Sequence, residues 1–155
     1  MGAYAILKFF HVLLAIVAVG ANVTYGVWIR RAARDPRALP FALRGIKALD
    51  DRLATPAYAL LLLTGLAMLH WSQDTWTTPW VLTALVLYAV AMVLALWGYT
   101  PTLRRQIEAL ETRGLESMEY RALAGRAQLV GVVLAVLMIL IVFLMVTKPA
   151  LWSPS

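Results

Sequence analysis

The chain has 155 residues, a length typical of one domain, and its mean hydropathy is +0.76. Only 14% of its residues are charged, against roughly 25% in soluble domains, so the composition indicates a protein embedded in lipid. The sequence has no cysteine, which excludes disulfides, thiolate metal sites, iron–sulfur clusters and cysteine nucleophiles. The net charge of +6 comes from basic residues that flank apolar segments, which indicates contact with anionic lipid heads and argues against nucleic acid as a partner.

Four apolar segments reach the length of about 20 residues that a membrane-spanning helix needs. They cover residues 4–28, 53–71, 79–99 and 127–147. The first begins with little positive charge, is too long for the apolar core of a signal peptide and is followed by arginines, so we expect it to remain as a helix. The predicted fold class is therefore all-α: an integral membrane four-helix bundle that forms one domain over residues 1–155.

Basic residues predict which side of the membrane each connection occupies. Residues 29–52 and 100–126 carry twelve of the fourteen lysines and arginines, and only Lys8 and Lys148 lie elsewhere. Because cytoplasmic connections carry the excess of Lys and Arg, both segments are predicted to be long basic cytoplasmic loops, with both termini outside. In these loops we expect short helices lying at the lipid heads, one of them over residues 102–113 and capped by Gly114.

Aromatic residues near the ends of the spans predict two interfacial belts, since tryptophan and tyrosine favour the membrane–water boundary. The outer belt is predicted to contain Trp71, Trp76, Trp80 and Trp152, and the inner belt Trp28, Trp97 and Tyr99.

Ionisable residues at membrane depth are costly unless they are satisfied, so each indicates a possible site. His11 lies about 10 Å below Tyr4 at 1.5 Å per helical residue, and a neutral imidazole there can bind haem iron or another metal. His70 closes the second span on the same side of the membrane and is either a second ligand or an interfacial histidine. Lys8 shares a face with His11 and either extends to the lipid heads or pairs with a porphyrin propionate.

Other polar and soft side chains within the spans leave more than one interpretation open. Met68, Met138 and Met145 offer thioether sulfurs, and Met68 and Met145 with the two histidines would suit copper, although methionines also pack or face lipid. Gly65 follows Thr64 and predicts a surface where two helices approach closely. Asn22 and Gln128 lie toward the inner side, where they either bond between helices or line a separate cavity.

Three stretches carry a resemblance to a known family: LKFFHVLLAIVAVG at 7–20, TPAYALLLLTGLAMLH at 55–70 and TTPWVLTALVLYAVA at 77–91. They resemble the bacterial family of predicted integral membrane proteins called domain of unknown function 2269. That family is similar in layout to the haem-b-carrying membrane protoporphyrinogen oxidase, whose Lys–x–x–His step matches Lys8 and His11, and to the membrane domain of copper resistance protein D. The resemblance implies a cofactor site centred on His11 in the bacterial inner membrane. The third helix lacks the lysine expected in the oxidase, which argues against porphyrinogen oxidation.

Three functional hypotheses follow. The first is a haem-b-binding protein in which His11 ligates the iron and His70 is a second ligand or a distal residue. Lys8 would neutralise a propionate of the haem. Such a protein would exchange electrons with quinol or with a periplasmic partner. The second is a cofactor-free accessory subunit of a homo-oligomer or a larger membrane complex. The third is copper or small-solute handling by His11, His70 and Met145. The sequence leaves open whether the protein is an enzyme; the first hypothesis would make it a haem-dependent oxidoreductase.

Overall fold

The computed structural model describes residues 2–72 and 74–151, and within them the chain is helical and has no strand. Its helices are α1 (Ala3–Ala32), α2 (Leu39–Leu49), α3 (Thr55–Trp71), α4 (Pro79–Val93), α5 (Thr100–Arg113) and α6 (Met118–Thr147). Two π-helical segments, η1 (Asp50–Ala54) and η2 (Leu94–Tyr99), join α2 to α3 and α4 to α5. Four continuous helices result, each long and apolar enough to cross a membrane, so the predicted all-α fold class is confirmed.

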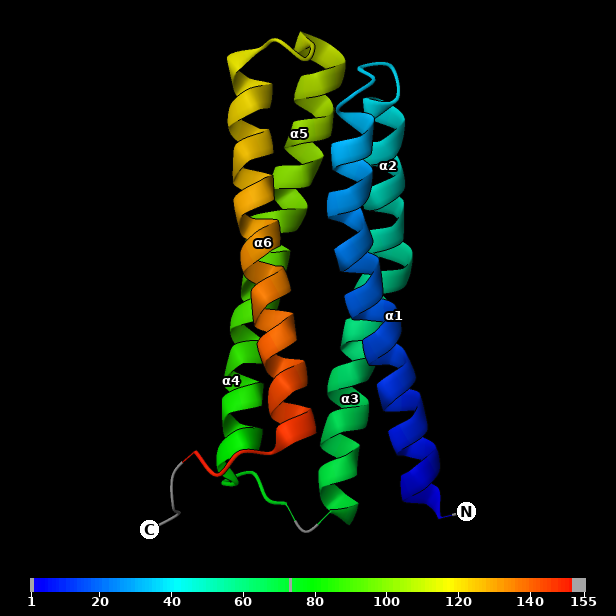
Figure 1. Cartoon of the computed structure of the whole chain (residues 1–155), viewed down its shortest axis with the longest axis vertical. Coiled ribbons are helices and arrows are strands. Elements are labelled where there is room, and N and C mark those ends of the chain that lie inside the picture. The colour runs from blue at the N-terminus through cyan, green and yellow to red at the C-terminus, as the bar shows by residue number, and fades with distance from the viewer. Residues whose placement is uncertain (1, 73, 152–155) are drawn as a thin grey trace.

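The four helices run side by side, as Figure 1 shows. The connections 33–38 and 114–117 lie at one end, which we call the basic end. The start of α1, the end of α6 and residues 74–78 lie at the other, which we call the terminal end.

The predicted long loops are wrong, because most of residues 29–52 and 100–126 continue the spanning helices. The helix Leu39–Trp71 has 33 residues, or about 50 Å at 1.5 Å per residue, whereas the hydrocarbon core of a bilayer is about 30 Å thick. The helices therefore project beyond the membrane, and α2 and α5 pack in this projection because each has an apolar face. The predicted helix over 102–113 lies within α5, and Gly114 ends it with a φ of +81° as expected of a C-terminal cap.

A threonine–proline step follows each π-helical segment. Proline has no N–H, and its ring collides with the carbonyl four residues earlier, which lies in η1 for Pro56 and in η2 for Pro101. The helix accommodates this collision by widening locally. The two prolines thus explain why both long helices change their hydrogen bonding at a similar depth.

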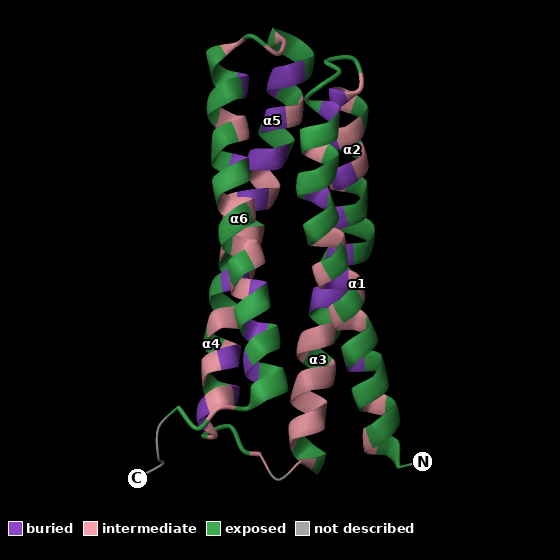
Figure 2. Ribbon diagram, viewed as in Figure 1, coloured by how far each residue is buried: buried purple, intermediate pink, exposed green. Residues whose placement is uncertain are grey.

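A hydrophobic core fills the basic end. It joins residues of α1, α2, α5, η2 and α6, and its buried members are Tyr25, Ala32, Leu39, Leu43, Ile46, Tyr99, Leu103, Ala109, Leu110 and Tyr120. Arg44 and Glu111 form an ion pair of 3.3 Å between α2 and α5 at its surface. Figure 2 shows buried residues on the facing sides of these helices.

Packing at the terminal end is looser. There the helices form two pairs, α1 with α3 and α4 with α6. The only buried residues of α3 are Ala57 and Tyr58, both in its first turn, and Figure 2 shows most of the helix beyond them as intermediate. A helix in a closed bundle would bury a stripe along its whole length, so α3 faces a space between the two pairs.

The aromatic belts are only partly as predicted. Trp28, Trp71, Trp76 and Trp97 are exposed, as belt residues should be. Tyr99 is 8% exposed and belongs to the core of the basic end, so its predicted place in a belt is wrong. Its position in η2 turns the ring inward between helices. Trp152 lies outside the described residues.

Candidate ligand cavity at the terminal end

A cavity of about 690 Å³ lies between the two helix pairs of the terminal end. Side chains from α1, α3, α4 and α6 line it, and most of them are apolar. Small-molecule sites in proteins have volumes of about 300–1,000 Å³ and are mostly apolar with a few polar groups. The cavity has the size and the lining of a ligand site.

His11 is the buried polar side chain in the wall that α1 contributes, and it is 9% exposed. Its Nδ1 lies 2.7 Å from Oγ1 of Thr64 on α3. The Thr64 hydroxyl donates its single proton to the carbonyl of Leu60, since two oxygens 2.7 Å apart need a proton between them. Thr64 must therefore accept from His11, so Nδ1 carries the imidazole proton and Nε2 keeps a free lone pair.

Gly65 makes room for the imidazole. A Cβ at this position would lie 3.2 Å from Cε1 of His11, which is closer than carbon atoms normally approach. The absence of a side chain at Gly65 thus lets the Nδ1–Cε1 edge of the ring rest against α3. Because His11 also lines the cavity, Nε2 is the ring nitrogen available to a ligand there.

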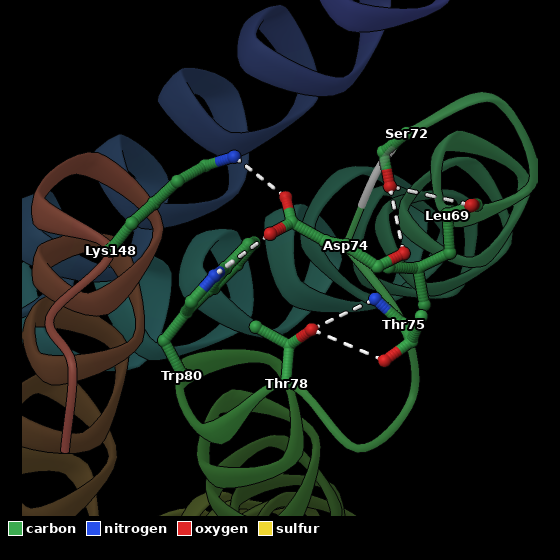
Figure 3. Close-up of polar contacts among 7 residues, drawn as sticks. All are labelled: Leu69, Ser72, Asp74, Thr75, Thr78, Trp80 and Lys148. Atoms are coloured by element: carbon green, nitrogen blue, oxygen red, sulfur yellow. Dashed lines mark hydrogen bonds and ion pairs between the residues drawn. The ribbon is translucent and has the colours of Figure 1, made fainter. Parts of the chain in front are cut away.

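A polar cluster closes one side of the cavity mouth (Figure 3). The ammonium of Lys148, just after α6, lies 2.8 Å from Oδ2 of Asp74, and the indole of Trp80 donates to Oδ1 of Asp74 at 3.4 Å. Lys148 also lies 4.8 Å from the centroid of the Trp80 ring, a cation–π contact. Lys8, one turn before His11 on α1, lines the cavity as well and is exposed. The lining therefore has two ammonium groups, and that of Lys148 is already paired with Asp74.

The floor of the cavity is built around Tyr58 of α3, which lines it. The Tyr58 hydroxyl accepts from the amide of Asn22 and donates to the carbonyl of Ala18 at 3.3 Å. Tyr88 of α4 donates to the carbonyl of Tyr58 at 2.7 Å. These bonds connect α1, α3 and α4 below the cavity and hold the two helix pairs together.

The structure brings together some of the predicted site residues. Lys8, His11, Met68, Met138 and Met145 all line the cavity. His70 does not: it is exposed at the end of α3, with its ring edge-on to Trp71 at 5.5 Å. Within the described residues no three His, Cys, Asp or Glu side chains are grouped as metal ligands would be. Gln128 is exposed on α6, whereas Asn22 lines a second, smaller cavity.

Sequence reasoning missed three functional features of this region. Thr64 was interpreted as a packing residue, and its partner became evident only from the approach of α1 to α3. Asp50 was counted as part of a basic loop, although an acid immediately before an apolar span is a recognisable signal. Asp74, the one charge in the link between the second and third spans, lies at the cavity mouth.

Comparison with known families decides what kind of protein has this arrangement. The family model described as "Predicted integral membrane protein (DUF2269)" matches residues 5–149. The chain belongs to this family. The DUF2269 match covers all four spanning helices and every residue that lines the cavity except Tyr4. No curated protein and no solved structure matched the chain.

Proposed function

We propose that this DUF2269 protein binds haem b in the cavity of the terminal end, with Nε2 of His11 as the axial ligand of the iron. The bond from His11 to Thr64 carries the proposal, because it leaves Nε2 with a free lone pair on a residue that lines the cavity. Haem-binding histidines commonly donate their other ring nitrogen to a partner that fixes the tautomer. A cavity of about 690 Å³ with apolar walls suits a macrocycle with a polar edge.

The polar edge of the haem would meet the two ammonium groups at the mouth. Lys8 lies on α1 beside His11, and Lys148 is held by Asp74 and Trp80. Carboxylates pair well with such groups. Met68 and Met145 line the same cavity and would offer thioether sulfurs to the haem, whereas His70 is exposed and does not line the cavity.

Bound haem b supplies reversible one-electron transfer. The chain would contribute the ligand at His11, a largely apolar wall and charge neutralisation by Lys8, whereas Lys148 would donate a hydrogen bond from its pair with Asp74. The positive-inside rule would place the terminal end outside, because the basic end carries twelve of the fourteen lysines and arginines. Electron exchange with quinol or with a periplasmic partner would then occur at the terminal end.

The two other hypotheses have less support. Copper binding by His11, His70 and Met145 would need His70 in the cavity, which it does not line. A cofactor-free subunit would need a partner element to fill the cavity that α3 lines, and the haem titration below distinguishes this hypothesis from haem binding.

Haem titration of the detergent-purified protein, made without haem supply, tests the proposal. We expect a Soret band that saturates at one haem per chain in the wild type and in His70→Ala, the matched control. His11→Ala should lose saturable binding, because no other imidazole lines the cavity. Equal titration curves for His11→Ala and the wild type would overturn the proposal.

A further inference from the structure

A second cavity, of about 40 Å³, lies where the two π-helical segments face each other. A water molecule needs about 10–15 Å³ of such space, so the cavity holds one ion or a few waters. Asp50 comes from η1 and Tyr99 from η2, and each segment is followed by a threonine, Thr55 or Thr100, that also lines the cavity. Asn22 of α1 and Tyr58 of α3 complete the polar lining.

Asp50 is the only charged residue in this lining, and it is 8% exposed. No hydrogen bond or ion pair within the described part of the chain involves its carboxyl group. Lys47, one turn earlier, pairs instead with Asp51, and that pair is partly exposed. A buried carboxylate whose nearby lysine is paired with another acid is costly, so a further cation or a proton compensates it.

The other polar groups favour a cation, because they offer oxygen. Thr55, Tyr99 and Thr100, which line the cavity, each carry a hydroxyl group. The Asn22 amide nitrogen donates to Tyr58, which leaves the Asn22 carbonyl oxygen free to accept. Hard cations prefer oxygen ligands, and a single carboxylate balances one positive charge, whereas protein calcium sites usually gather several.

The backbone adds a second indication. π-helical segments within α-helices are rare and occur often at functional sites, and here two of them border one small cavity. Sodium sites in membrane proteins are commonly built where a spanning helix is interrupted.

We propose that the cavity between η1 and η2 is a binding site for one monovalent metal cation of the size of sodium, with Asp50 as the charged ligand. The oxygens of Asn22, Thr55, Tyr99 and Thr100 would complete the coordination. This site shares Tyr58 and Met138 with the lining of the large cavity, but the proposal does not rest on haem binding there.

The test uses full-length protein in detergent at fixed ionic strength, with sodium chloride replaced stepwise by choline chloride. We expect the thermal midpoint of the wild type to rise with sodium and equilibrium binding of radioactive sodium to reach one ion per chain. Asp50→Asn, which keeps the shape of the side chain, should bind no sodium and show a flat midpoint. Asp35→Asn, an exposed acid of the connection 33–38 that lies outside the cavity, should behave as the wild type.

Two results would overturn the assignment. One is a wild-type midpoint that is the same in sodium and in choline, or that responds only to acid, which would mean that a proton neutralises Asp50. The other is sodium binding by Asp50→Asn equal to that of the wild type. If Asp50→Asn does not fold, Thr100→Val keeps the carboxylate and removes one oxygen, and it should shift sodium saturation to higher concentration.

Discussion

Nδ1 of His11 and Oγ1 of Thr64 lie 2.7 Å apart although 53 residues separate them in the sequence. The bond joins α1 to α3 in the wall of the large cavity, in a region where α3 buries no side chain. It sets the imidazole tautomer and fixes the ring on one side of the cavity. The orientation of His11 therefore depends on a residue that does not itself line the cavity.

Thr64→Val tests this dependence. Valine keeps the shape of threonine and removes the acceptor, so the His11 N–H loses its partner and the tautomer is no longer fixed. Loss of such a partner typically weakens metal binding by about 10–100-fold, and we expect a decrease of this size in haem affinity by titration.

Thr83→Val is the matched control. Thr83 of α4 also donates to a carbonyl of its own helix, that of Pro79 at 2.8 Å, and it does not line the cavity. Haem affinity equal to the wild type is expected for this variant. Equal affinities in Thr64→Val and Thr83→Val would mean that Thr64 does not position His11.

Gly65→Ala should displace the imidazole. The new Cβ would lie 3.2 Å from Cε1 of His11, so the ring must move by a few tenths of an ångström. We expect weaker haem binding in a protein that still folds. Gly26→Ala in α1 is the control, because no atom lies within 4 Å of its Cβ position, and it should gain about 0.5–1 kcal/mol from helix propensity. Unchanged haem affinity in Gly65→Ala would contradict the role given to this close contact.

Hydropathy and charge predicted the all-helical bundle of four apolar helices, because 20-residue apolar runs have few alternatives in lipid. They did not predict that α2 and α5 extend the bundle. Amphipathic segments rich in arginine suit either a membrane surface or a projecting bundle, and only the packing of Leu43 and Leu103 distinguishes the two.

His11 could be selected from sequence because it is an isolated ionisable residue. The contact of His11 with Thr64 and the exposed position of His70 depend on how each helix is rotated about its axis. Helices that are apolar on all sides have no periodic pattern that would predict this rotation.

Leu43→Ala tests whether the basic end is a packed core. Leu43 is 0% exposed, and truncating a buried leucine typically costs about 2–5 kcal/mol of unfolding free energy. Phe41→Ala on the same helix is the control: the ring is 80% exposed, so the change should stay within about 0.5 kcal/mol. Denaturant unfolding in detergent measures both. If neither variant is destabilised, α2 lies on the membrane surface instead.

Orientation can be measured directly, because the chain has no cysteine. Thr77→Cys marks the terminal end and Glu116→Cys the basic end, and both positions are exposed. The distribution of Lys and Arg predicts that a membrane-impermeant thiol reagent labels Thr77→Cys in intact cells. Glu116→Cys should react only after the membrane is permeabilised. The opposite pattern would place the haem cavity on the cytoplasmic side.

The most direct measurement of the central claim is an absorption spectrum of the protein purified from cells with ample haem supply. The spectrum is recorded for the oxidised protein and again after reduction with dithionite, and His11→Ala is measured in the same way. We expect a Soret band that sharpens on reduction in the wild type and is lost in His11→Ala. A wild-type preparation without a Soret band, or a His11→Ala variant with the full band, would contradict haem ligation by His11.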